Sequence, residues 1–172
     1  RPGEVVVARL SGGVAVVRFT EDAGSGVKLA LGRNREARVP AGRVLLATGF
    51  VPQNQEAFEE FRARCQGVAS EIDLSEVWDV VVDDGETSTL HELAELYWGD
   101  GHDPARLAAL ALHLEESTDY FTFDAGGYAP QSRDDLESLL TRRNREVRHV
   151  VEAQELASAL ADGHLPDAAT EY

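Results

Sequence analysis

The sequence has few of the features that would point directly to a class of protein. It has one cysteine, Cys65, so it forms no internal disulfide and no zinc site of several thiolates. Because Cys65 shares a predicted helix face with Phe61, we expect it to be a buried, inert thiol. No apolar run approaches the roughly 20 residues of a membrane helix, and Arg1–Val5 lacks the apolar stretch of a signal peptide. We therefore expect a soluble cytoplasmic protein with no membrane partner.

Motifs for metal ions and nucleotides are also missing. The segment His91–Glu95 resembles the start of a zinc-peptidase helix, but its fifth position is Glu95, where that motif needs a second histidine. The glycines Gly24 and Gly26 do not continue into a dinucleotide-binding pattern, and no Walker-type lysine follows a glycine-rich stretch. The acidic turn at 83–86 lacks the spaced oxygen ligands of a calcium loop. We expect no metal site, no cofactor and no catalytic residue in this chain.

Charge is distributed unevenly along the sequence. The whole chain has 16 basic and 31 acidic side chains, which gives a formal net charge of −15. Residues 1–50 hold eight basic and four acidic side chains, whereas residues 51–132 hold three basic and 18 acidic ones. Because phosphate contacts supply most of the affinity of nucleic-acid binders, only the first segment favours such a partner. Fifteen of the 16 basic residues are arginine, which is also typical of proteins from GC-rich genomes.

Residues 1–50 have the pattern of a small β-structure. Apolar and β-branched residues dominate five short runs, which predict strands at 5–10, 14–19, 27–31, 36–39 and 44–46. Glycine-containing segments between them supply turns, because glycine adopts a positive φ without a Cβ clash. Strands at this spacing predict a small SH3-like or OB-like β-barrel. Such barrels carry nucleic-acid or protein contacts, and the fold alone does not say which.

The apolar pattern changes to a helical period after residue 51. It predicts four helices, at 53–64, 73–83, 89–98 and 103–116. The first is expected to end before Gly67. The third begins with a capping box of Thr89 and Glu92, and the fourth has Asp103 as N-cap and Pro104 at the first helical position.

A hairpin and a long helix complete the expected fold, which is of the α+β class. Alternating aromatic residues at 119–123 and 128–129, around a Gly-Gly turn, predict a β-hairpin. Three helices followed by a hairpin is the order of a winged helix-turn-helix. The expected domains are a β-barrel at 1–50, a winged-helix module at 51–131, and a linker helix and tail at 132–172. The last helix extends to about Ala161, and its apolar residues need a partner.

Arginines of the predicted barrel are the best candidates for phosphate contact: Arg33, Arg35, Arg38 and Arg43. Alternate residues of a strand share a face, so Arg33, Arg35 and the strand ends could converge. The same charges could equally protect a solvated sheet edge from pairing. The expected recognition helix at 103–116 has only Arg106 and His113 against three acidic residues, so we expect it to read a DNA groove poorly.

One series of residues carries a family resemblance. It consists of Val77–Asp79, Asp84, Thr89, Leu93–Tyr97, Pro104, Ala108–Ala109, Leu112, Asp119–Phe121, Tyr128 and Pro130. In this order and spacing, over about residues 75–145, the series resembles the amino-terminal region of the ribonuclease II family. The branch concerned occurs in cyanobacteria, plastids and some other bacteria.

The resemblance implies a function. In that branch a small barrel and a helix-turn-helix module precede a domain that hydrolyses RNA from the 3′ end, with magnesium held by clustered aspartates. Those aspartates are not present in this sequence, so the resemblance implies a non-catalytic, RNA-engaging accessory region. Its partners would be single-stranded RNA and the catalytic domain of the same polypeptide, which would hold the magnesium. The alternative interpretation is an acidic winged-helix protein-interaction or scaffold module without nucleic-acid binding.

Overall fold

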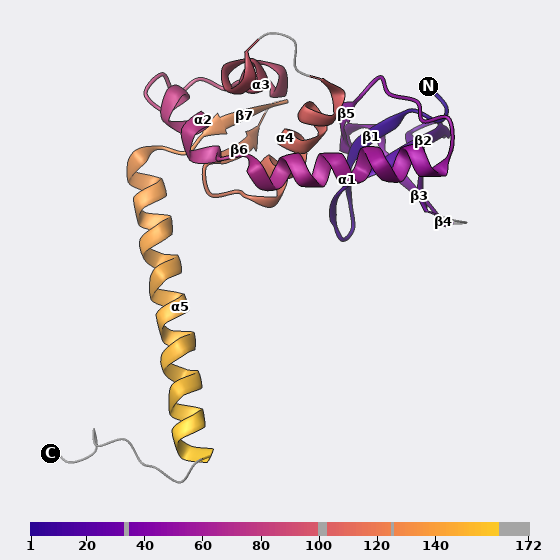
Figure 1. The fold of residues 1–172 in the computed structure, drawn as a ribbon. Helices are drawn as coiled ribbons and strands as arrows, with labels where there is room; N and C mark the ends of the chain where they lie inside the picture. The colour runs from indigo at the N-terminus through magenta and orange to yellow at the C-terminus, as the bar shows by residue number, and fades with distance from the viewer. Residues whose placement is uncertain (33–34, 100–102, 125, 162–172) are drawn as a thin grey trace, which may run out of the picture. The chain divides into compact units, whose positions relative to one another are not determined.

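The computed structural model describes the chain except residues 33–34, 100–102, 125 and 162–172 (Figure 1). The chain divides into two compact units, Arg1–Gln131 and Ser132–Tyr172, and each is described by itself. In its described part, the first unit contains a five-stranded antiparallel sheet, four α-helices and a two-stranded hairpin. The fold class is therefore α+β, as predicted. The domain boundary expected near residue 51 stays a prediction.

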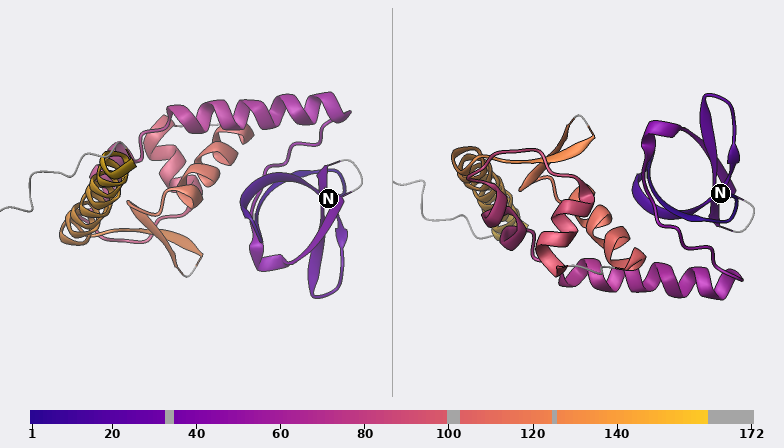
Figure 2. Two further views of the ribbon diagram at one scale, coloured as in Figure 1. Left: turned by 90° about the horizontal axis from the view of Figure 1, so that it is seen from below. Right: turned by 90° about the horizontal axis from the view of Figure 1, so that it is seen from above.

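The sheet is open, and the expected closed barrel is not formed. Its strands are β1 (Val5–Leu10), β2 (Gly13–Asp22), β3 (Gly26–Gly32), β4 (Arg35–Pro40) and β5 (Val44–Ala47). The order is β4-β3-β2-β1-β5, so β4 and β5 are the two edges, and no ladder joins them in the described residues. Figure 2 shows that the sheet is strongly curled. The four-residue β5 pairs with β1 alone, and the short turn η1 (Ala41–Arg43) leads to it from β4.

Both faces of the sheet carry apolar side chains. The inner face of the curl holds a buried cluster of Val6, Ala8, Val17, Val27, Leu29 and Val39. Because side chains alternate along a strand, Val5 and Val7 of β1 point to the outer face, and they too are fully buried. Helix α4 (Pro104–Glu116) packs against this outer face at β1 and β2. Strand β1 is thus buried on both faces, which explains its continuous apolar run.

The remaining helices largely begin where the sequence predicts. They are α1 (Gln55–Glu71), α2 (Leu74–Val81) and α3 (Leu90–Trp98). Side-chain caps begin α2 at Asp73, α3 at Thr89 and α4 at Asp103, and α3 has the complete capping box. The expected end of α1 before Gly67 is wrong. The helix continues and buries Ala69, and this packing outweighs the roughly 1 kcal/mol that glycine costs inside a helix.

Helix α4 is the most buried helix of the first unit. Eight of its 13 residues are buried. It packs against α1 and α3 in addition to the sheet. A helix that reads a DNA groove must present an exposed face of polar side chains. The packing of α4 leaves little such surface, and its poor capacity to read DNA stays a prediction.

A polar cluster joins β1 and α4 to the hairpin of β6 (Phe121–Asp124) and β7 (Gly127–Pro130). Arg9 donates two hydrogen bonds to the Glu115 carboxylate, at 2.5 and 2.6 Å. The Tyr128 hydroxyl donates to the same carboxylate at 3.3 Å. The hydrogen bond to Glu115 raises the pKa of Arg9, and burial raises the pKa of Tyr128. At neutral pH the cluster therefore holds a charged guanidinium and an un-ionised phenol.

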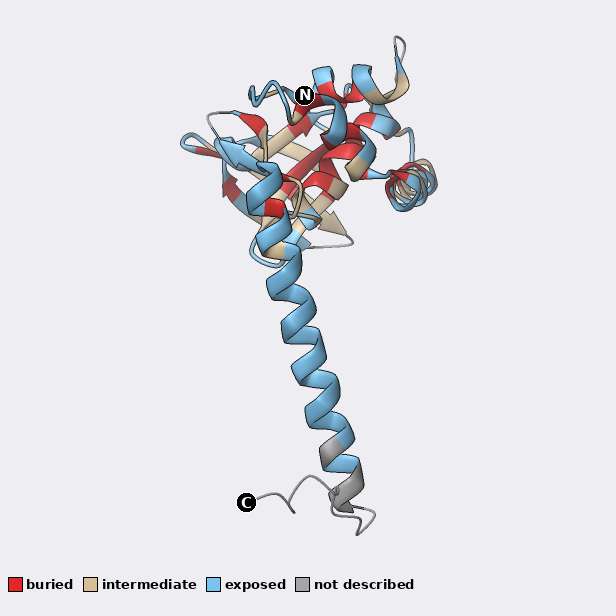
Figure 3. Cartoon of the chain, turned by 90° about the vertical axis from the view of Figure 1, so that its left-hand side faces the viewer, coloured by how far each residue is buried: buried red, intermediate tan, exposed pale blue. Residues whose placement is uncertain are grey.

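The second unit contains the long helix α5 (Arg133–Ala161). Its first turn is capped by Ser132, whose hydroxyl accepts from the Asp135 N–H at 3.1 Å. Figure 3 shows that most of this helix is exposed. Its exposed side chains include Leu140, Val147, Val150 and Val151. In the part of the chain that the structure describes, no helix has both the length and the apolar character needed to cross a bilayer.

Candidate functional site

The arginines predicted to contact phosphate do not form one cluster. Arg33 lies outside the described residues. Arg35 and Arg38 are both in β4, but three positions separate them, so their side chains point to opposite faces of the sheet. Arg43 is exposed at the end of η1. The structure thus divides this set, and RNA contact by its members stays a prediction.

Arg38 is engaged on the outer face of the sheet. It donates a hydrogen bond to the carbonyl of Ala23, in the turn between β2 and β3. Its register partner on β3 is Lys28, which pairs with Glu21. The hydrogen bond between Lys28 and Glu21 raises the pKa of the lysine and lowers the pKa of the carboxyl group. These contacts give Arg38 a role in bracing the turn.

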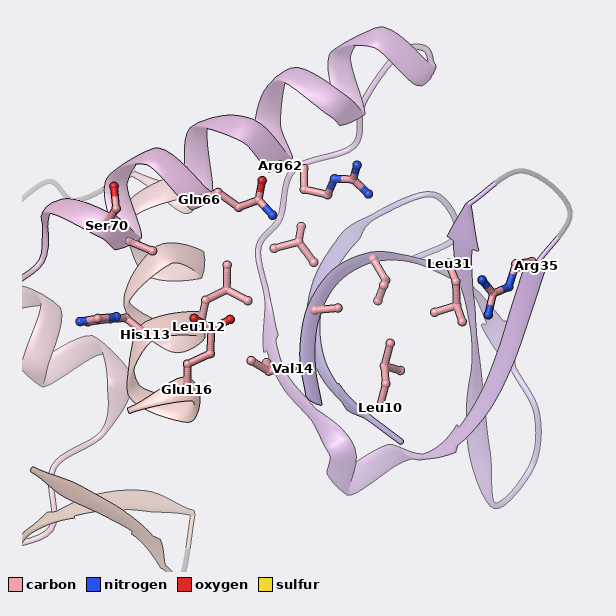
Figure 4. A pocket seen from close by; sticks show the side chains of 14 residues that line it. Leu10, Val14, Leu31, Arg35, Arg62, Gln66, Ser70, Leu112, His113 and Glu116 are labelled. Carbon is pink, nitrogen blue, oxygen red and sulfur yellow. The ribbon is translucent and has the colours of Figure 1, made fainter. Parts of the chain in front are cut away.

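Arg35 lines a groove between the curled sheet and helices α1 and α4 (Figure 4). The groove has a volume of about 550 Å³. Its sheet side is mostly apolar and includes Leu10, Val14 and Leu31. Its helix side carries the polar residues Arg62, Gln66, Ser70, His113 and Glu116. We call this site the sheet groove.

Two guanidinium groups enter the sheet groove from different elements. Arg35 comes from β4, and its guanidinium forms no hydrogen bond or ion pair with another described residue. Arg62 comes from α1, where it pairs with Glu59 at 2.6 Å and lies over the Phe58 ring. The carboxylate of Glu116 lines the same groove. The two arginines of the sheet groove are thus balanced by Glu59 and Glu116, and Arg35 carries the positive charge that no described carboxylate pairs with.

The sheet groove has the composition of a binding site. Its volume lies within the range of about 300–1,000 Å³ that is usual for small-ligand sites. Within the described residues, no three His, Cys, Asp or Glu side chains are grouped so that they could hold a metal ion. Cys65 is fully buried, as predicted, and burial raises the pKa of its thiol to about 12. The arrangement of the sheet groove can hold an anion beside an apolar group.

Sequence reasoning did not select Arg62. A usable signal exists, because residues 51–132 contain only three basic side chains, Arg62, Arg64 and Arg106. Arg64 pairs with Asp103 at 2.5 Å, and Arg106 lies over the Trp98 ring. Only the tertiary structure shows which of the three reaches the sheet groove.

Comparisons with known proteins gave no relative. No protein-family model matches the chain, and no match was found among curated proteins or solved structures. The resemblance to the ribonuclease II family therefore stays a hypothesis that rests on the residues quoted for it.

Proposed function

We propose that this chain is an RNA-engaging accessory region of a ribonuclease II-like 3′-to-5′ exoribonuclease, and that it is not catalytic by itself. In this proposal α2, α3, α4 and the hairpin are a winged helix-turn-helix, and the open sheet is a relative of the SH3-like and OB-like barrels. Magnesium would belong to the catalytic domain of the same polypeptide. Single-stranded RNA would contact the sheet groove.

The observation that carries the RNA proposal is the presence of two guanidinium groups beside an apolar wall. Arg35 and Arg62 can each donate to phosphate oxygens, because a guanidinium presents several N–H groups in one plane. The aliphatic side chains of β1, β2 and β3 offer an apolar contact surface to an unstacked base. Single-stranded RNA exposes its phosphates and the faces of its bases at the same time, whereas a duplex hides its base faces. The burial of α4 also argues against duplex reading.

Charge sets the expected strength of this binding. Because Arg62 already pairs with Glu59, the two arginines neutralise at most about two phosphates, which limits the slope of the logarithm of the association constant against the logarithm of salt concentration to about −1.4. The net charge of −15 opposes the approach of RNA. We therefore expect micromolar or weaker affinity for the isolated chain.

A titration of labelled single-stranded RNA at low and moderate salt tests the proposal. Arg35→Ala is expected to weaken binding about tenfold, since a hydrogen bond to a charged group contributes about 1.5–3 kcal/mol. Arg1→Ala is the control, because it removes the same charge from an exposed residue that does not line the sheet groove. Equal losses for the two variants would show general attraction to arginine and reject the sheet groove. Absence of salt-sensitive binding by the wild type would reject RNA engagement.

A second candidate function, an acidic protein-interaction or scaffold module, is favoured by a different observation. Residues 65–105 contain 11 acidic side chains and no lysine or arginine. This segment includes α2 and α3, so a large part of the helical region repels phosphate. If the RNA titration fails, this second function is the one that the charge distribution supports.

A further inference from the structure

A separate groove lies between α2 and α3 of the first unit. It has a volume of about 480 Å³ and is lined by Glu76, Val77, Val80, Leu96, Tyr97 and Trp98. Val80 is 60% exposed and Leu96 is 52% exposed. They are the two most exposed large apolar side chains in the described part of this unit. We call this site the α2–α3 groove.

The aromatic wall of the α2–α3 groove is already held in place. The Tyr97 hydroxyl accepts a hydrogen bond from the Asp73 N–H at 3.3 Å. The rings of Tyr97 and Trp98 meet edge to face, with centroids 5.0 Å apart. The Arg106 guanidinium lies 5.7 Å from the centroid of the Trp98 ring. A partner therefore meets an ordered surface and does not have to fix these side chains on binding.

The surroundings of the α2–α3 groove are mainly negative, and the Arg106 guanidinium over the Trp98 ring is the positive group beside it. Glu76 lines it, and Glu95 is exposed next to Leu96 on α3. Both belong to the segment 65–105, which has 11 acidic residues and neither lysine nor arginine. RNA and anionic lipid headgroups would both be repelled there, since they carry phosphate. A partner must combine an apolar contact with positive charge.

We propose that the α2–α3 groove docks a basic amphipathic helix of a protein partner. The partner would place one or two apolar side chains against Val80 and Leu96, with lysine or arginine facing Glu76 and Glu95. The eight residues of α2 are about 12 Å long, which matches about two turns of a docked helix. This interaction is independent of the proposed RNA contact, which uses other residues of the first unit.

The test uses the full chain and two synthetic peptides of 16 residues. The first places leucines at i, i+3, i+4 and i+7 of a lysine- and arginine-rich helix, and the second has the same composition in scrambled order. Binding is measured by fluorescence anisotropy of the labelled peptides. We expect the helical peptide to bind at least about fivefold more tightly, because only it presents its leucines on one face. Equal binding of both peptides would overturn the proposal, because it would show that the negative charge of the chain alone attracts them.

Variants then locate the binding site. Val80→Asn is expected to weaken binding of the helical peptide about fivefold, because it removes apolar area from the contact. Val147→Asn is the matched control, since Val147 on α5 is a valine of similar exposure, at 57%. Both positions are exposed, so circular dichroism and Tm should confirm that each variant folds as the wild type does. Equal effects of the two substitutions would exclude the α2–α3 groove.

Charge reversal provides an independent readout. Glu76→Lys should weaken binding of the helical peptide several-fold. Glu60→Lys, at an exposed position of α1, should weaken it less. A third peptide, with glutamate in place of the basic residues, should bind the Glu76→Lys variant more tightly than it binds the wild type. If Glu60→Lys has the same effects as Glu76→Lys, long-range attraction alone explains the binding and the proposed docking site is wrong.

Discussion

Strands β1 and β4 belong to one sheet but differ in how they are covered. Strand β1 lies between the core of the curl and α4, and its first four residues are all buried. Strand β4 is an edge strand, and four of its six residues are exposed. On the covered strand β1, Arg9 binds Glu115 of α4. On the edge strand β4, Arg35 lines the sheet groove. Residue type alone therefore does not indicate which arginines serve binding.

The largest expected effect concerns the covered strand. Val7→Ala removes two methyl groups from a fully buried site on the outer face of β1. We expect it to lower the free energy of unfolding by about 2 kcal/mol, through lost transfer energy and a residual cavity. Glu36→Ala, at an exposed position of β4, should change stability by less than about 0.5 kcal/mol. Urea denaturation measures the free energy of unfolding of both variants. Similar losses would show that the two strands do not differ in their contribution to stability.

Arg9 of β1 and Arg35 of β4 test the same difference between a covered strand and an edge strand. Arg9→Ala leaves the Glu115 carboxylate, which is 11% exposed, without its ionic partner. We expect a loss of about 1–2 kcal/mol, less than for a fully buried pair because the Arg9 side chain is 33% exposed. Arg35→Ala should leave stability nearly unchanged and reduce RNA binding. A stability loss for Arg35→Ala equal to that for Arg9→Ala would show that the sheet groove is structural.

Elements of this fold that depend on neighbouring residues were predictable from the sequence, whereas contacts between distant residues were not. Strands, caps and the hairpin were predictable because they depend on local signals, such as the reciprocal bonds of Thr89 and Glu92. Closure of the sheet was predicted wrongly, because it depends on whether two distant edges pair. The end of α1 was also wrong, since tertiary packing extends the helix beyond Gly67.

The candidate site was only partly predictable for the same reason. Alternation along β4 indicates that Arg35 and Arg38 point to opposite faces, but it does not show which face borders a groove. The position of Arg62 in the sheet groove depends on the packing of α1 near the sheet, which no local pattern specifies. Val80 lies away from the helix face that the buried residues Leu74, Val77, Trp78 and Val81 form, so its exposure agrees with the local pattern. Exposure of Leu96 follows from tertiary packing.

A smaller effect is expected from the capping box of α3. Hydrogen bonds from the backbone and side chain of Thr89 lower the pKa of Glu92 below its usual 4.5. A lowered pKa contributes stability that is present above the unfolded value and is lost as pH falls through the folded value. Glu92→Gln should therefore reduce the loss of Tm on acidification from about pH 5 to pH 3. Glu95→Gln, outside the capping box, should follow the wild type more closely, and identical profiles for all three proteins would contradict the prediction.

The reactivity of the Cys65 thiol reports how well α1 covers the core. Its thiol is fully buried, and burial raises its pKa to about 12, so the reactive thiolate is scarce at neutral pH. A thiol reagent should therefore modify native Cys65 far more slowly than it modifies a peptide thiol, with the rate set by opening of the structure. In a Cys65→Ala background, Val80→Cys provides the exposed counterpart and should react at nearly the peptide rate, because Val80 is 60% exposed. Equal rates for the two thiols would mean that α1 opens readily and does not protect Cys65 from the reagent.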